Sequence, residues 1–103
     1  EQILQVVPPD TDVTFYRTHT GEEIDLVLTL ADGRRLAIEV KHTAAPKYSP
    51  AMGRAMEAIG AAHGYVVTAG RDAFPLAAKV DAVPLHRFLT ETLPRVITPP
   101  TNS

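Results

Sequence analysis

Two alternating segments on either side of Asp32-Gly33 constrain the fold more than any other feature of this sequence. Residues 23–30 carry isoleucine or leucine at every even position, and residues 35–41 carry leucine, isoleucine and valine at theirs. Strict alternation over seven or eight residues is typical of a β-strand with one buried face. Because Asp-Gly favours a tight turn, the pattern predicts an antiparallel hairpin.

The register of this hairpin follows from the same alternation. The apolar residues of both strands share a face only if paired positions sum to an even number, which requires a loop of odd length. A three-residue loop over 31–33, with Gly33 in the left-handed region, meets that condition. The predicted apolar pairs are Ile24 with Val40, Leu26 with Ile38, and Leu28 with Leu36. The opposite face then carries Asp25 across from Glu39 and Glu23 across from Lys41.

The remaining segments alternate between strand and helix signals. Residues 13–17 and 65–68 are rich in β-branched and aromatic residues and are predicted as strands, with an edge strand over 79–83. Ser49-Pro50 predicts a helix start, an apolar stripe follows at helical spacing, and Gly64 is the predicted stop. A second helix is predicted over 84–93. The order strand, helix, strand predicts a parallel crossover. We therefore expect an α/β fold with a mixed sheet of about five strands and flanking helices.

Length and composition indicate one small domain. The chain has 103 residues, of which 45% are hydrophobic and 21% charged. Residues 13–93 are the expected domain, and the proline-rich residues 94–103 are an expected flexible tail. The chain begins with Glu1 rather than methionine, so residues 1–12 are interpreted as the remnant of an upstream element and a connector in a longer protein.

Composition also excludes several classes of site. The chain has no cysteine, which rules out a thiolate zinc site and a cysteine nucleophile and fits a cytoplasmic location. No apolar run approaches the roughly 18–20 residues that span a bilayer, so we expect no membrane association. A net charge of −2 provides no general attraction to nucleic acid. Because no glycine-rich phosphate loop occurs, we expect this segment to bind no nucleotide.

The acidic residues of the hairpin are the main candidates for chemistry. Directly opposed strand residues have Cβ atoms about 4.5–5.5 Å apart, so Asp25 and Glu39 would repel each other unless a cation lay between them. Mg²⁺ and Mn²⁺ suit such oxygen ligands. Lys41 beside the metal can deprotonate a water and stabilise phosphate charge. The alternative is a solvated strand face on which Glu23 and Lys41 form an ordinary ion pair.

These residues also carry a family resemblance. Asp25, a thirteen-residue gap and then Glu39-Val40-Lys41 resemble the motif of the PD-(D/E)XK nuclease superfamily. With Phe-Tyr-Arg-Thr at 15–18 and Gly-Glu-Glu-Ile-Asp at 21–25, the chain is similar to a C-terminal domain of unknown function in prokaryotic proteins that begin with an AAA-type P-loop ATPase domain. The likeness covers roughly residues 13–90. It implies a restriction-endonuclease-like core: an antiparallel meander, a crossover helix and a parallel strand.

The resemblance also implies roles for individual residues. Asp25 and Glu39 become ligands of Mg²⁺ or Mn²⁺, Lys41 the catalytic lysine, and Glu23 an auxiliary acid near the metal. The implied activity is metal-dependent phosphodiester hydrolysis, with DNA or RNA and an upstream ATPase domain as partners. Two family features are missing: an acidic residue on a helix before Val13 and a glutamine near residues 52–55. The alternative is therefore a catalytically inactive nuclease-fold module for protein interaction or oligomerisation.

Histidines, cations and aromatic residues outside the motif complete the candidates. His19 and His42 flank the acidic residues and are possible further ligands or proton carriers, whereas His63 is interpreted as a charge at a helix C-terminus. The cations available to a phosphate backbone are Arg17, Arg34, Arg35, Lys47 and Arg54. The aromatic residues considered for base stacking, with core packing as the alternative, are Tyr16, Tyr48 and Phe74.

Overall fold

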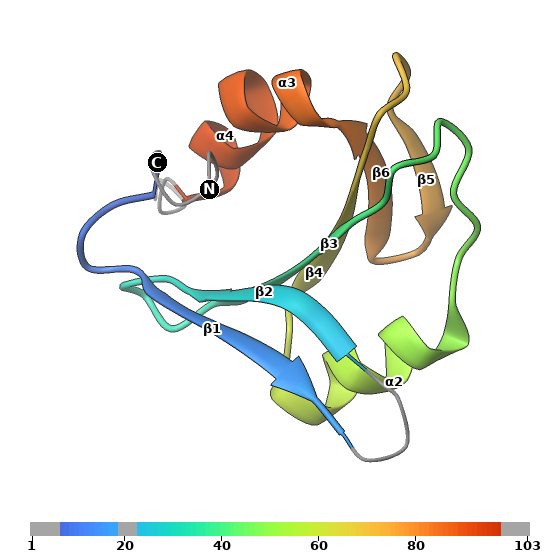
Figure 1. The fold of residues 1–103 in the computed structure, drawn as a ribbon. Coiled ribbons are helices and arrows are strands. Elements are labelled where there is room, and N and C mark those ends of the chain that lie inside the picture. The colour runs from blue at the N-terminus through green and yellow to red at the C-terminus, as the bar shows by residue number, and fades with distance from the viewer. Residues whose placement is uncertain (1–6, 19–22, 98–103) are drawn as a thin grey trace.

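A computed structural model describes residues 7–18 and 23–97 of the chain, without the side chain of Glu23. One mixed sheet of six strands organises the fold, in the order β1-β2-β3-β4-β6-β5 (Figure 1). The strands are β1 (Asp12–Arg17), β2 (Glu23–Thr29), β3 (Arg35–Val40), β4 (His63–Thr68), β5 (Phe74–Ala77) and β6 (Val80–Pro84). The predicted α/β class is confirmed, with one strand more than the expected five.

Strand directions divide the sheet into two parts. Strands β1, β2 and β3 form an antiparallel meander. Strands β3, β4 and β6 run parallel to one another, as the crossover prediction required for β4. The prediction of an edge strand over 79–83 is wrong, because β6 lies between β4 and β5. The edge strand on this side of the sheet is β5, which contains Pro75; an edge strand tolerates a residue without a backbone N–H.

The hairpin between β2 and β3 has the predicted loop and register. Leu30 N–H donates to the carbonyl of Arg34 at 2.8 Å, which closes a three-residue loop over 31–33. Gly33 has a φ of +92°, a conformation that costs glycine little. Leu26 pairs with Ile38 and Leu28 with Leu36, which confirms two of the three predicted apolar pairs.

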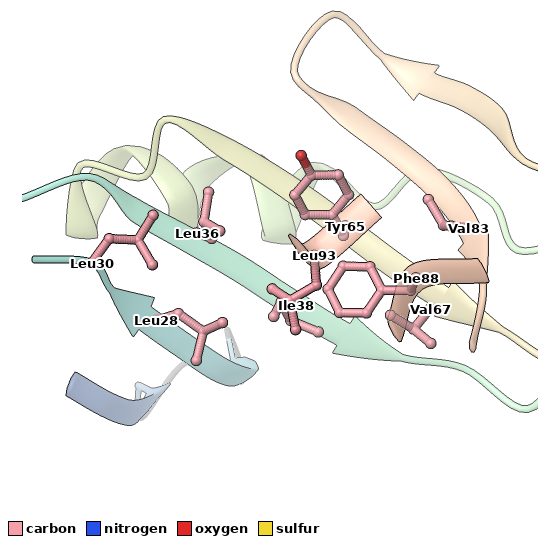
Figure 2. Packing of buried hydrophobic residues seen from close by; sticks show 9 residues of the cluster. All are labelled: Leu28, Leu30, Leu36, Ile38, Tyr65, Val67, Val83, Phe88 and Leu93. Carbon is pink, nitrogen blue, oxygen red and sulfur yellow. The ribbon is translucent and has the colours of Figure 1, made fainter. Parts of the chain in front are cut away.

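Helices cover both faces of the sheet (Figure 1). On one face, α2 (Pro50–Ile59) packs its methionines against the sheet. On the other lies the C-terminal helical segment, composed of α3 (Leu85–Arg87), a π-helical turn (Phe88–Thr92) and α4 (Leu93–Ile97). Figure 2 shows the core beneath that segment, where the Phe88 ring lies against strand side chains. Its nine buried residues are Leu28, Leu30, Leu36, Ile38, Tyr65, Val67, Val83, Phe88 and Leu93.

Helix α2 starts at the predicted position and ends before the predicted stop. Pro50 occupies its first turn, and the Ser49 carbonyl accepts a hydrogen bond from Met52 N–H at 3.0 Å. The helix ends at Gly60, which has a φ of +69°, and not at the predicted Gly64. Gly64 lies in β4 beneath α2, where a Cβ atom would stand 2.7 Å from the sulfur of Met56. Its small size therefore serves helix–sheet packing rather than helix termination.

The C-terminal helical segment continues to Ile97, four residues beyond its predicted end at Leu93. Pro94 has no N–H to donate within a helix, and a π-helical turn precedes it, in which Leu93 N–H donates to the Phe88 carbonyl. Residues 94–97 of the expected flexible tail are thus helical, and residues 98–103 lie outside the described residues. Within the described part of the chain, no helix has the length and apolar character needed to cross a membrane.

Candidate metal centre

A β-bulge in β2 positions Asp25. Thr14 pairs with Val27 and Tyr16 with Ile24, so two residues of β2, Asp25 and Leu26, stand opposite Phe15 alone. A bulge re-aims the side chains of the strand that contains it. Ile24 consequently lies in the core under α2 with Val27, and not on the face of Leu28 as predicted. Alternation cannot reveal this shift, because it assumes an uninterrupted pleat.

Asp25 is directed at β3 and replaces a missing strand contact. The paired ladder between β2 and β3 ends at Leu26 and Ile38, so the predicted direct pairing of Asp25 with Glu39 is not part of it. Instead, Asp25 Oδ2 accepts a hydrogen bond from Val40 N–H at 2.8 Å. Among the described residues, Oδ1 of the same carboxylate has no hydrogen-bond partner. The carboxylate thus lies beside the backbone that joins Glu39 to Lys41.

Glu39 and Lys41 lie at the end of β3 and contact each other. The Glu39 side chain is 13% exposed and that of Lys41 is 48% exposed, with Lys41 Nζ 3.8 Å from Glu39 Oε2. Lys41 N–H donates to the Val67 carbonyl at 2.9 Å, which keeps this part of the backbone beside β4. The structure therefore brings Asp25, Glu39 and Lys41 together at one end of a central strand.

The face that carries Glu39 is not a freely solvated one. Val27 is 4% exposed and Ala37 is fully buried, because α2 covers the middle of this face. The solvated face considered as the alternative is therefore covered at Val27 and Ala37, whereas Asp25 and Lys41 are exposed to solvent. Glu39 follows Ala37 on the same face of β3 and lies at the border of the covered region.

Two loops meet near this end of the sheet. The carboxyl ends of the parallel strands β3, β4 and β6 lie at the same end of the sheet, which is a usual position for ligand sites in α/β proteins. Gly70, after β4, passes close to Ala44, after β3: a Cβ atom on Gly70 would lie 2.9 Å from the Ala44 carbonyl oxygen. The chain after Lys41 is thereby held against the neighbouring loop.

Other predicted ligands are only partly described. The backbone of Glu23 pairs with Arg17, while its side chain and the whole of His19 lie outside the described residues. His42 is exposed just beyond β3. Within residues 7–18 and 23–97, no group of three histidine, cysteine or acidic side chains converges on one point. The described donor set is thus Asp25 and Glu39, and Glu23 stays a prediction.

Several other candidates have structural partners. Arg35 Nη1 donates to the Ile59 carbonyl at 2.8 Å, so this cation caps the C-terminus of α2. Arg34 Nε donates to Asp32 Oδ2 at 2.7 Å, and a hydrogen bond from the Arg34 backbone helps to lower the pKa of Asp32. His63 begins β4 and Nε2 lies 3.0 Å from Asp81 Oδ2, so its predicted position at a helix C-terminus is wrong.

Several hollows contain residues considered for ligand contacts, and two of them bear on the candidate centre. A cleft of about 690 Å³ between α2 and the β5–β6 turn is lined in part by Tyr48 and Arg54 and contains neither candidate carboxylate. A smaller cleft of about 290 Å³ contains Asp25. Its lining residues are Phe15, Tyr16, Arg17, Ile24 and Asp25. Phe15 is 74% exposed. From the sequence, it was named only within the segment 15–18 and was not among the aromatic residues considered for base stacking.

Comparison with known proteins places the chain in a family. The model of a family described as a domain of unknown function, DUF4143, matches residues 1–88. No curated protein and no solved structure matches the chain significantly. Since the match covers most of the sequence, the chain belongs to the DUF4143 family.

Proposed function

We propose that this chain is a nuclease-like module of the PD-(D/E)XK type, which hydrolyses phosphodiester bonds of nucleic acid with Mg²⁺ or Mn²⁺. One observation carries the proposal: Asp25, Glu39 and Lys41 gather at the end of β3, with the Asp25 carboxylate bonded to the backbone between the other two. The strand order also supports a restriction-endonuclease-like core, since a meander is followed by a crossover helix and a parallel strand. An ATPase domain upstream in the same protein is part of this proposal.

The donor set suits a divalent metal. Asp25 Oδ1 has no partner among the described residues, and Glu39 supplies a second, largely buried carboxylate. Mg²⁺ commonly takes one or two protein carboxylates and keeps several waters, so two ligands suffice. Asp25 and Glu39 would hold the ion, with Glu23 as an auxiliary acid. When bound, the metal supplies Lewis-acid stabilisation of the charge that develops on the phosphate.

Lys41 is the residue proposed to act on water. Its ammonium is half-exposed and only 3.8 Å from Glu39, so it can reach both solvent and a phosphate near the carboxylates. As an ammonium, Lys41 can orient the attacking water and stabilise the phosphate charge, and in its neutral amine form it can accept the proton of that water.

A second candidate function is a catalytically inactive module that binds protein partners or further copies of the chain. The hydrogen bond from Val40 N–H gives Asp25 a structural role that needs no metal. The absence of a third converging ligand within the described residues also favours this alternative.

Calorimetric titration with Mn²⁺ distinguishes the two. The proposal predicts saturable binding by the wild type that Asp25→Asn and Glu39→Gln each abolish. Asp32→Asn is the matched control, since this carboxylate lies at the distant hairpin turn and should leave binding unchanged. A wild type that does not bind Mn²⁺, alone or with nucleic acid present, would overturn the metal site and leave the second candidate. Binding followed by metal-dependent cleavage of DNA or RNA, lost in Lys41→Ala, would establish the enzyme.

A further inference from the structure

The most exposed large apolar side chain in the described part of the chain, Phe15, lines a cleft together with Asp25, one of the candidate metal ligands. Phe15 is 74% exposed, about twice the exposure of Val13, Tyr48 or Leu85. It belongs to neither core cluster, whereas its neighbour Tyr16 packs against the core under α2. Burial of a phenylalanine stabilises a folded protein, and Phe15 contributes little of that stabilisation because it stays exposed. The ring is therefore accessible to a ligand.

The bulge places Phe15 next to Asp25. Phe15 is the β1 residue opposite Asp25 and Leu26, and β1 is the outer strand of the meander (Figure 1). Phe15 and Asp25 both line the cleft of about 290 Å³, together with Arg17. An aromatic ring, a cation and a candidate metal ligand thus share one small hollow. Its volume lies near the lower end of small-molecule sites, which begin at about 300 Å³, and suits one nucleotide rather than a helix.

We propose that this cleft holds an unpaired nucleobase stacked on Phe15, so that the substrate class is single-stranded nucleic acid. This proposal rests on the proposed function, because it places the phosphate next to the stacked base near Asp25. Arg17 contacts the phosphate backbone, a role for which a guanidinium is well suited. A base inside a duplex is already stacked on its neighbours and must be unpaired and extruded, at a cost in free energy, before it can reach Phe15. The structure therefore favours single strands over duplexes.

Binding can be tested without cleavage. The probes are oligothymidylate and oligouridylate of about 15 nucleotides, each with one 2-aminopurine, and the matched duplexes. Fluorescence is measured in EDTA at low salt, with the intact protein and with its Asp25→Asn variant, which removes a repelling charge. We expect the single strands to bind and the 2-aminopurine emission to fall on stacking. Duplexes should bind more weakly. A preference between the two oligonucleotides would assign DNA or RNA.

Variants of Phe15 decide whether stacking is responsible. Stacking of one base on an aromatic side chain is worth about 1–3 kcal/mol. The Phe15→Ala variant should therefore bind the single-stranded probes about 5- to 150-fold more weakly than the wild type and show no change in 2-aminopurine emission. Phe15→Trp should restore both, and Leu85→Ala, which removes another exposed apolar side chain, should change neither. Circular dichroism verifies that Phe15→Ala is folded, as its exposure implies.

Other outcomes would overturn the proposal. Equal binding of duplex and single strand, or unchanged binding by Phe15→Ala, would remove the stacking site. Self-association of the wild type that Phe15→Ala abolishes, without oligonucleotide binding, would instead assign Phe15 to contact with a second copy. The oligonucleotide measurements contain no metal, so they are independent of the Mn²⁺ titration. If the base stacks on Phe15 but the protein does not bind Mn²⁺, only the proposed metal site is refuted. Mn²⁺ binding without stacking would refute only this inference.

Discussion

Oδ2 of Asp25 accepts a hydrogen bond from Val40 N–H at 2.8 Å, and this bond spans the point at which β2 and β3 stop pairing. The bulge at Asp25 interrupts the pleat of β2, and the Asp25 carboxylate satisfies a backbone donor of β3 beyond the last paired residues, Leu26 and Ile38. One side chain therefore stabilises the end of β3 and presents its other oxygen at the candidate metal centre.

The two roles of Asp25 can be separated by substitution. Asp25→Ala removes the acceptor and should lower the free energy of unfolding by about 0.5–1.5 kcal/mol. Asp25→Asn retains a carbonyl oxygen for Val40 N–H, so it should cost less while still abolishing Mn²⁺ binding. Urea denaturation of both variants provides the measurement. Equal destabilisation by alanine and asparagine would show that charge, and not the hydrogen bond, accounts for the stability.

Much of the fold could be predicted from local pattern, and the failures have identifiable physical causes. The hairpin register was predictable because a two-residue period and a turn sequence together allow few pairings. The position of Ile24 was not predictable, because a bulge leaves no mark on the alternation. The sequence does not distinguish a glycine that ends a helix from one that allows close packing, and Gly64 is of the second kind.

The candidate site was predictable to a similar degree. The alternating pattern brought Asp25 and Glu39 to one end of the hairpin, and the structure places them there through Val40 instead of by direct pairing. The exposure of Phe15 could not be predicted, since it depends on β1 being an edge strand, which a local strand pattern does not reveal.

Docking of α2 on the sheet can be tested at two glycines. Gly64→Ala would bring a Cβ atom to 2.7 Å from Met56 and 3.0 Å from Met52, both buried, and should destabilise the protein by about 1–2 kcal/mol. Gly53→Ala is the control, because the atom it approaches is the hydroxyl of Tyr48, at the end of a partly exposed side chain. Gly53→Ala should be neutral or stabilising, as alanine favours helices by up to about 1 kcal/mol. Thermal denaturation of both variants gives the two melting temperatures. Equal melting temperatures for Gly64→Ala and Gly53→Ala would contradict the close packing of α2 on Gly64.

The two adjacent arginines at the hairpin should differ in their effect on stability. Arg35→Ala removes the hydrogen bond to the Ile59 carbonyl and the favourable charge at the end of α2, a loss of about 0.3–1 kcal/mol. Arg34→Ala removes an ion pair with Asp32 at the turn, and surface pairs of this kind contribute little. Urea denaturation at low and high salt provides the comparison. A larger loss for Arg34 than for Arg35 would refute the capping role.

Tyr65 should make the stability of the protein fall at alkaline pH. Burial in the core raises the pKa of Tyr65 above its usual value of 10.0, and the nearby charge of Asp81 raises it further. The folded state therefore keeps a proton that the unfolded chain releases near pH 10, so this contribution to stability is complete below that pH and is lost as the pH rises through the folded pKa. The free energy of unfolding of the wild type should decline above pH 10, and that of Tyr65→Phe, which carries no ionisable hydroxyl, should decline less. In Asp81→Asn the phenolate absorbance assigned to Tyr65 should appear at lower pH than in the wild type. If the free energy of unfolding declined equally above pH 10 in the wild type and in Tyr65→Phe, the decline would belong to other ionisable groups.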